Sequence, residues 1–407
     1  MQTVKRFLIP VLLLVLIPVA AAQPGTLLNV EDTGVYAPGQ VDGQVAGRFR
    51  NNGETAPQAE TAVHTYLIQF ESTWPDGEPA PITAQLYVPE QPADPQHLLV
   101  FGPGSTGLVE MCAPSRQFVD NRSFDTYTAY TLAYAGQGSF AIVPNYMGFF
   151  DEGVIQPYFD KVAEGRVMLD AIRAATGVLR ELGVVADEGQ LPAFVAGYSQ
   201  GGHAAFAAAD LHGEYAPETN LLGVVGFGSS TIMSNLFLEF TYVSPWVIHA
   251  ANAFSPELLD PAQLLVEPYL SNLSSDAERL CILEAQQYYP GSPDALFTPA
   301  FVAALRNGTL EQEFPAVAQF FARNDAGLAG HGFPAIILQG VDDPVVHLDS
   351  QDEFVRGLCE RDSAVRYPNY LRTRHETRYI GFRDALEWMK SLAGGAPAPS
   401  DCELVID

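Results

Sequence analysis

The chain contains few basic residues for its length. Lys and Arg total 21 of the 407 residues, against 48 Asp and Glu, so the formal net charge is −27. Only three of the basic residues are lysines. A surface this acidic repels phosphate groups, so we expect neither nucleic acid nor an anionic membrane as a partner.

Long hydrophobic runs are also rare, and the most prominent one extends from Phe7 to Val19. It is too short for a transmembrane helix, which needs about 20 apolar residues. Lys5 and Arg6 precede it and three alanines follow, an order typical of a secretory signal peptide. No cysteine follows the run, which argues against a lipoprotein anchor. We therefore predict a signal peptide over residues 1–22, cleavage near Ala22, secretion to the periplasm or the exterior, and no stable membrane span.

Cysteine is scarce as well. The four cysteines are Cys112, Cys281, Cys359 and Cys402, and no two have the CxxC spacing of a zinc site. An even number of cysteines in an exported chain favours disulfide bonds. Four cysteines allow three pairings. We favour Cys112 with Cys281 and Cys359 with Cys402, because the last two lie near each other at the C-terminal end.

Glycine, in contrast, is abundant, and one glycine motif carries the functional signal. Residues 194–203 are Phe-Val-Ala-Gly-Tyr-Ser-Gln-Gly-Gly-His, an apolar strand that runs into Gly-x-Ser-x-Gly and then a small-residue helix. This context is typical of a nucleophile elbow, whose turn is too sharp for side chains at Gly197 and Gly201. The turn would expose the hydroxyl of Ser199. A chance match is the alternative, but the flanking strand and helix favour the elbow.

The rest of the chain alternates apolar strands with helix-length segments, which predicts an α/β fold with a mostly parallel sheet and helices on both faces. Residues 158–182 have helical spacing, and Asp170 and Arg173 are placed there to pair. Residues 23–60 show no strong period, and Pro79 to Pro81 should separate the first two strands. The expected strands are His64–Glu71, Ile82–Val88, Leu98–Phe101, Phe140–Val143, Phe194–Ala196, Leu221–Gly226, Pro334–Leu338 and Val365–Tyr370, and the last helix is Phe382–Leu392.

About a hundred residues between Ser229 and Gly332 break this alternation. Their pattern indicates several short helices separated by Pro and Gly. We interpret them as a helical cap over the site, and a small helical domain with its own core is the alternative. The predicted organisation is a signal peptide (1–22), an N-terminal extension (23–60), a core in two parts (61–230 and 331–407) and the inserted cap (231–330).

A serine nucleophile needs a base, and the base needs a carboxylate that orients it. In a fold with this elbow the chain order is Ser, Asp, His. Asp343 stands three residues after Gly340, at the end of the strand over 334–338. Its neighbour Asp342 is the alternative acid, because a shift of one residue would exchange their roles. The more distant Asp349 is expected at the surface.

His375 is the predicted base. It lies between the last predicted strand and the last helix, which is the loop where this fold places its histidine. Among the other seven histidines, His203 follows Ser199 by four residues on the helix of the elbow. We expect His203 to be a packed helix residue.

The oxyanion of an acyl-transfer reaction needs two backbone N–H donors. One is predicted to be Gln200, directly after the nucleophile. The other should come from the loop at 102–107, where either Ser105 or Thr106 would donate. An ordinary glycine and proline turn is the alternative for this loop.

Taken together, these residues resemble the secretory lipase family, α/β-hydrolases of the lipase A type with many bacterial relatives. The resemblance covers about residue 60 to the end. Pro103 and Asn145 depart from the family pattern, which often has His and Asp at these places. The matching segments are Gly-Ser-Thr-Gly at 104–107, Cys-Ala-Pro-Ser at 112–115, Pro-Asn-Tyr-Met-Gly at 144–148, Leu-Asp-Ala-Ile-Arg-Ala-Ala at 169–175, the elbow, and the regions of Asp343 and His375.

The resemblance implies an α/β-hydrolase fold, a helical cap over the acyl site, the disulfide pairing favoured above, and neither a metal nor an organic cofactor. It also implies hydrolysis of carboxylic esters. The predicted protein is thus a secreted serine hydrolase, a lipase or carboxylesterase, that cleaves a small-molecule or lipid ester through an acyl-enzyme. A secreted peptidase of the same fold would use the same residues. A non-catalytic binding protein of this fold is disfavoured, because all three catalytic residue types are present.

Overall fold

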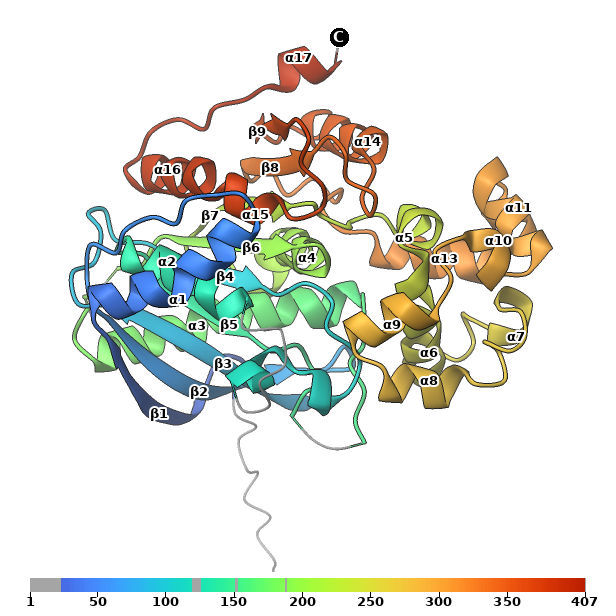
Figure 1. Cartoon of the computed structure of the whole chain (residues 1–407), viewed down its shortest axis with the longest axis horizontal. Helices are drawn as coiled ribbons and strands as arrows, with labels where there is room; N and C mark the ends of the chain where they lie inside the picture. The colour runs from blue at the N-terminus through green and yellow to red at the C-terminus, as the bar shows by residue number, and fades with distance from the viewer. Residues whose placement is uncertain (1–22, 119–125, 151–152, 187–188, 407) are drawn as a thin grey trace, which may run out of the picture.

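A single sheet runs through the centre of the protein (Figure 1). The computed structural model describes residues 23–118, 126–150, 153–186 and 189–406, so the expected signal peptide lies outside the described residues. The strands in the described part are β1 (Leu27–Tyr36), β2 (Val63–Thr73), β3 (Pro79–Pro89), β4 (Leu98–Gly102), β5 (Phe140–Pro144), β6 (Ala193–Tyr198), β7 (Leu221–Phe227), β8 (Ala335–Gly340), β9 (Val365–Arg366) and β10 (Asn369–Tyr370).

The strand order is β1-β2-β3-β5-β4-β6-β7-β8-β10, and β9 also pairs with β8. The first three strands pair antiparallel, and β3 is antiparallel to β5. All the remaining pairs are parallel. The mostly parallel sheet predicted from the sequence is therefore confirmed, with an antiparallel entry at one edge. The carboxyl ends of the parallel strands meet at one side of the sheet, where functional groups are expected.

Helices cover both faces of the sheet, and the central strands are buried on both sides. In β4, Leu99 and Phe101 pack into one apolar cluster and Leu98 and Val100 into the other. Such strands appear in the sequence as continuous apolar runs, because neither face of the sheet is exposed to water there. One cluster contains α1 (Pro38–Asn51), α2 (Thr126–Gly136), α15 (Thr377–Ile380) and α16 (Phe382–Ala393), and the other contains α3 (Lys161–Glu181), α4 (Gln200–Tyr215) and α14 (Leu348–Cys359).

A group of helices, here called the helical insertion, follows β7 and precedes β8 in the chain. It lies beside the sheet, at the right of Figure 1. It has a large apolar cluster that includes the fully buried Phe237, Trp246 and Phe301. Its helices are α5 (Met233–Glu239), α6 (Ser244–Phe254), α7 (Pro261–Leu264), α8 (Leu273–Arg279), α9 (Ile282–Tyr288), α10 (Pro293–Leu296), α11 (Pro299–Asn307), α12 (Leu310–Glu313) and α13 (Pro315–Asn324). Short 3-10 helices are Glu110–Cys112, Pro114–Phe118 and Thr241–Val243.

Residues 23–60 were expected to contain no regular element, yet β1 and α1 lie there. The side chains of β1 are nearly all exposed, so they carry no alternating apolar signal. In α1, the buried residues Val41, Val45 and Phe49 recur every four positions. That spacing is the helical signal that could have found α1.

Other boundaries differ from the expected ones for local reasons. The helix expected from residue 158 begins at Lys161, because Phe159 has a positive φ of 57° and Asp160 caps the helix by accepting a hydrogen bond from Ala163 N. Prolines were expected to separate the first strands, but β3 begins at Pro79 and pairs with β2 along its length. The strand expected at 365–370 is split into β9 and β10 around Pro368, which has no N–H to donate.

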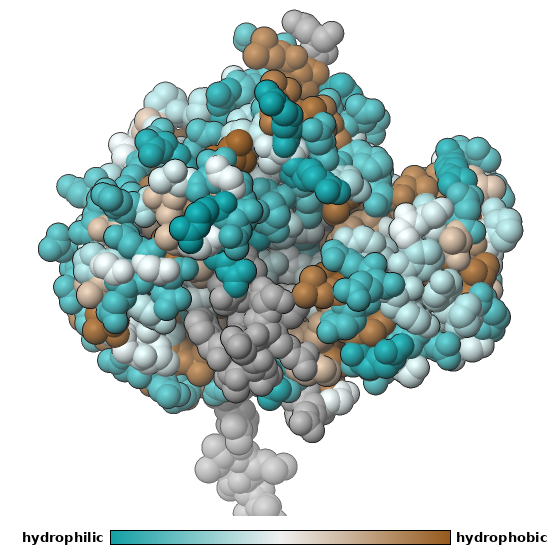
Figure 2. Space-filling view, in the orientation of Figure 1, coloured by the Kyte–Doolittle hydropathy of each residue, from teal (hydrophilic) through white to brown (hydrophobic). Residues whose placement is uncertain are grey.

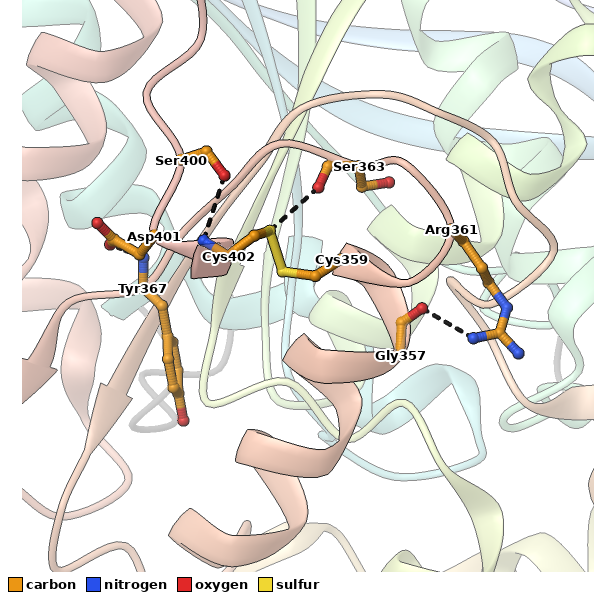
Figure 3. Close-up of a disulfide and its surroundings, with 8 residues drawn as sticks. All are labelled: Gly357, Cys359, Arg361, Ser363, Tyr367, Ser400, Asp401 and Cys402. Carbon is orange, nitrogen blue, oxygen red and sulfur yellow. Dashed lines mark hydrogen bonds between the residues drawn. A yellow bond between two sulfur atoms is a disulfide. The ribbon is translucent and has the colours of Figure 1, made fainter. Parts of the chain in front are cut away.

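Two disulfides join distant segments, in the pairing favoured from the sequence. Cys112 is bonded to Cys281, with Cα atoms 5.6 Å apart, and this links the loop after β4 to the helical insertion. Cys359 at the end of α14 is bonded to Cys402 (Figure 3), which begins the last helix, α17 (Cys402–Ile406). Asp401 beside it accepts a hydrogen bond from Tyr367 N at 2.8 Å. The C-terminal segment is therefore fastened to the core.

The surface of the protein is largely polar. The face shown in Figure 2 is mostly hydrophilic, with scattered hydrophobic residues. No helix among the described residues has the length and apolar character needed to cross a membrane.

A buried polar cluster joins the sheet to α3 and α4, and Asp170 is at its centre. Its side chain is fully buried and accepts hydrogen bonds from Ser72 Oγ at 2.6 Å, Arg173 Nη1 at 2.7 Å and Tyr215 Oη at 2.9 Å. The pairing of Asp170 with Arg173 predicted from the sequence is confirmed. A buried carboxylate of this kind is costly unless every partner is present.

Asp170→Ala should therefore lower the free energy of unfolding by about 3–5 kcal/mol, because the buried Ser72 hydroxyl and the half-buried donors of Arg173 and Tyr215 all lose this acceptor. Urea unfolding of the disulfide-intact protein, followed by tryptophan fluorescence, measures the change. The matched control is Asp294→Ala, which breaks an exposed pair with Arg306 and should have little effect. Equal shifts for the two variants would contradict the role given to Asp170.

Candidate active site

Ser199 occupies the turn between β6 and α4. Its backbone has φ 55° and ψ −114°, a conformation that non-glycine residues rarely adopt. Its N–H donates to Phe227 O at 3.0 Å, and its C=O accepts from Gly202 N at 2.9 Å. The surrounding backbone therefore holds the residue in a strained turn, as it does at functional sites.

Two glycines make this turn possible. A Cβ at Gly197 would lie 1.9 Å from Gly201 O, and a Cβ at Gly201 would lie 1.9 Å from Gly102 O. Both distances are far below van der Waals contact, and the atoms that would be struck belong to the backbone and cannot rotate away. The elbow is thus packed directly on the end of β4, where the loop with Ser105 and Thr106 begins.

The structure brings Asp343 and His375 together. His375 Nδ1 lies 2.8 Å from Asp343 Oδ2, while Asp343 Oδ1 accepts hydrogen bonds from Val345 N at 2.8 Å and Val346 N at 3.0 Å. Asp343 is buried, whereas the alternative acid Asp342 is exposed. The geometry therefore favours Asp343 as the partner of the histidine.

The hydrogen bonds of His375 also assign its tautomer. A carboxylate oxygen only accepts, so Nδ1 carries the proton that is directed at Asp343. Nε2 is then the free acceptor in the neutral ring. It is buried and has no hydrogen-bond partner among the described residues. An unprotonated Nε2 held in this way is what a general base requires.

A cavity of about 720 Å³ joins Ser199 and His375, since both residues line it. The ring of Tyr198, directly before the serine, lies 4.8 Å from the ring of His375 between centroids. The walls come from the core and from the helical insertion. The other residues of the lining are Asn52, Glu54, Ser105, Glu239, Phe240, Tyr242, Ile282, Gln286, Gly291, Pro344, Val345, Arg372, Thr373, Arg374, Glu376 and Ile380.

The two candidates of the loop after β4 differ in where they lie. Ser105 lines the cavity, and its Oγ is hydrogen-bonded to Tyr158 Oη. Thr106 is not part of the lining, and its carbonyl accepts a hydrogen bond from Ile282 N in the helical insertion at 2.9 Å. Gln200 begins α4, so its N–H has no acceptor within the helix. The structure thus brings Gln200 and Ser105 to the same site as Ser199.

Sequence reasoning missed a charged pair next to the histidine. The guanidinium of Arg378 is buried 4.1 Å from the ring centroid of Tyr198 and forms an ion pair of 2.7 Å with Glu376. Burial would raise the pKa of the Glu376 carboxyl, but Arg378 outweighs burial and holds that pKa below its usual value. The sequence offers little signal for this pair, because its tyrosine partners come from several elements.

No group of three His, Cys, Asp or Glu side chains within the described ranges is arranged to hold a metal ion. The groups that the structure brings together are the hydroxyl of Ser199, the imidazole of His375 and the carboxylate of Asp343.

The strand order and the elbow define an α/β-hydrolase. The sequence pattern of the secretory lipase family matches residues 124–400 of this chain, which is more than half of its length. The chain belongs to the secretory lipase family, as the resemblance of its motifs indicates. Family and fold together support ester hydrolysis as the activity.

Relatives in sequence carry esterase and lipase names. The chain is 24% identical over 396 residues to a trichothecene C-3 esterase of Fusarium sporotrichioides, a match that covers 91% of this chain and 80% of the relative. It is 22% identical over 371 residues to a lipase A of Arthroderma benhamiae, covering 83% of this chain and 72% of the relative.

Solved structures of similar fold include an esterase and a lipase. The rice cell wall degrading esterase LipA from Xanthomonas oryzae superimposes with a TM-score of 0.72 at 18% identity, covering 92% of this chain and 99% of the other. Candida antarctica lipase A gives a TM-score of 0.68 at 17% identity, covering 94% of this chain and 84% of the other. At these identities the likeness concerns the fold alone.

The packing of the elbow leads to a test with a control on the same helix. Gly201→Ala should abolish activity and lower stability, because its Cβ would strike Gly102 O. Gly213→Ala, near the other end of α4, places its Cβ in open space and should stabilise the helix by about 0.5–1 kcal/mol. Thermal unfolding and ester hydrolysis measure both effects. An active, stable Gly201→Ala variant would contradict the described elbow.

Proposed function

We propose that this chain is a secreted serine esterase in which Ser199 is the nucleophile, His375 the general base and Asp343 the residue that orients it. The observation that carries the proposal is the position of His375. One ring nitrogen is bound to Asp343, and the other is unpaired among the described residues at a cavity that Ser199 also lines. The secretory family, two disulfides and the signal-like start of the chain support secretion.

In the proposed reaction, Ser199 Oγ attacks the carbonyl carbon of the ester while His375 Nε2 takes the serine proton. The carbonyl oxygen becomes an oxyanion and accepts hydrogen bonds from the N–H groups of Gln200 and Ser105. One such donor is worth about 10²–10³ in kcat. His375 then returns the proton to the leaving alcohol, and the acyl group remains on Ser199. Water, deprotonated by the same nitrogen, releases the acid and restores the serine.

The lining of the cavity favours short acyl chains and polar esters. Most aromatic residues of the helical insertion are buried in its own cluster and are not available to a substrate. The apolar wall that the insertion contributes is formed by Phe240, Tyr242 and Ile282. Carboxylate, amide and guanidinium groups make up much of the rest. A long alkyl chain would meet these polar groups and would leave them without water.

The nucleophile is tested with Ser199→Ala. This variant should hydrolyse p-nitrophenyl butyrate about 10⁴-fold more slowly or worse, because the hydroxyl that attacks the ester carbonyl is removed. Ser275→Ala, an exposed position of the helical insertion, is the control and should retain full activity. A fluorophosphonate probe should label the wild type and Ser275→Ala but not Ser199→Ala. Retained turnover without Ser199 would refute the assignment, and a wild type that is neither labelled nor active would indicate a non-catalytic binding protein.

The substrate class is tested with a series of p-nitrophenyl esters from two to sixteen carbons. We expect kcat/KM to be highest for short acyl chains and to fall at least about tenfold by sixteen carbons, because each missing apolar contact removes transfer free energy. Tributyrin should likewise be preferred to triolein. Aminoacyl p-nitroanilides should not be cleaved. A maximum at long chains would indicate a lipase instead, and rapid amide cleavage would indicate a peptidase.

A further inference from the structure

A buried carboxylate lies behind the elbow and has no part in the proposed reaction. Glu164, in the first turns of α3, is 1% exposed. Its Oε1 accepts hydrogen bonds from Phe159 N at 3.0 Å and from Gln200 Nε2 at 2.7 Å. Its Oε2 lies 2.6 Å from His203 Nδ1. Burying a carboxylate this deeply destabilises the fold unless hydrogen bonds and a counter-charge compensate for the lost water. Its position in the core therefore points to a structural role.

His203 forms the counter-charge of Glu164. Its ring is fully buried, and its second nitrogen, Nε2, lies 2.7 Å from Asn324 O. Because a carbonyl only accepts, Nε2 carries a proton, and Nδ1 faces a carboxylate. Burial lowers the pKa of His203, but the Glu164 carboxylate and the hydrogen bond to Asn324 O together raise it above its usual value. The two side chains therefore form a buried ion pair.

The pair holds α4 at two points, one turn apart. Gln200 and His203 are the first and fourth residues of α4, so they lie on one face of the helix. Both side chains bind the same carboxylate of α3. Two contacts at this spacing fix the rotation of the first turn about the helix axis. That turn carries the Gln200 N–H, and an oxyanion donor must be placed to within about 0.5 Å to be effective.

The same carboxylate also orders the segment that contacts the other side of the oxyanion site. Glu164 accepts from Phe159 N, at a residue with positive φ that precedes the cap of α3. The neighbouring residue, Tyr158, is hydrogen-bonded through its hydroxyl to Ser105 Oγ. The positions of Gln200 and Ser105 therefore both depend on Glu164, although Glu164 does not line the cavity.

We propose that Glu164 and His203 are positioning residues for the oxyanion site, which act through Gln200 on one side and Tyr158 on the other. This inference rests on the proposed function, because it takes Ser199 as the nucleophile. It assigns Glu164 no contact with the substrate. The consequence is that loss of Glu164 should impair the transition state more than substrate binding.

Two substitutions at Glu164 separate positioning from charge. Glu164→Gln keeps an acceptor for Phe159 N and Gln200 Nε2, and its amide can donate to Nδ1 of a neutral His203. It should keep kcat within about threefold of the wild type. Glu164→Ala removes all three hydrogen bonds and should lower kcat for p-nitrophenyl butyrate about 10–100-fold with KM changed less than about threefold. Glu181→Ala, exposed at the end of the same helix, is the control and should change neither constant.

Two measurements distinguish positioning from partial unfolding. Titration of active sites with a fluorophosphonate gives kcat per competent serine, which should still be low in Glu164→Ala. An alkyl boronic acid, whose adduct with the serine is tetrahedral, should bind more weakly in proportion to the loss of kcat. If Glu164→Ala does not fold, Gln200→Ala removes one of its contacts while retaining the N–H at 200, and should lower kcat per site about 3–10-fold.

The outcomes are decisive in both directions. A loss of kcat per competent site, matched by weaker boronate binding and rescued in Glu164→Gln, supports the proposal. An unchanged kcat per site in the folded variants overturns it, as does a loss explained wholly by fewer competent sites. A wild type that shows neither labelling nor turnover refutes the proposed function instead, so the two failures are distinguishable.

Discussion

The contact between three stretches of backbone is the constraint on which the proposed site depends. The end of β4, the end of β6 and the first turn of α4 approach so closely that Gly197 and Gly201 have no room for a Cβ, and a Cβ at Gly102 would lie 3.0 Å from the backbone of Gly201. This contact forces the unusual backbone of Ser199 and, at the same time, sets the distance between the serine and the loop with Ser105. The proposed nucleophile and the proposed oxyanion loop are therefore held together by one rigid contact of the backbone.

The helical insertion is bonded to two segments of the core that flank the proposed site. Ile282 N donates to Thr106 O, and the disulfide from Cys281 to Cys112 joins the same two segments covalently. On the other side, Glu239 at the end of α5 accepts a hydrogen bond from His347 N, four residues after Asp343. The insertion thus connects the loop after β4 to the segment that follows Asp343. Anchors of this kind keep the cavity wall in register with the reacting groups, as preorganised sites require.

Sequence reasoning led to the residues of the candidate site where a short local pattern marks them. The elbow, the Gly340-x-x-Asp343 segment and the position of His375 before the last helix each follow or precede a recognisable element, and the structure brings the three together. It failed where partners are adjacent only in space. Glu164 contacts two residues of α4 from another helix, and no spacing in the chain records that contact. The exposed strand β1 was missed for a different reason, since a strand without a buried face has no alternating pattern.

The core and the helical insertion contribute different parts of the proposed site. The residues proposed for the chemistry come from the ends of core strands and the loops after them, where burial and close packing tolerate little change. Phe240 and Tyr242 of the insertion face the same cavity, and the ring of Phe240 is 6.3 Å from that of His375. Phe240 follows α5 and belongs to the apolar cluster of the insertion, and Tyr242 in the next 3-10 helix packs against that cluster. Replacing the two rings would reshape this wall of the cavity without disturbing the elbow, so the insertion can vary while the core stays unchanged.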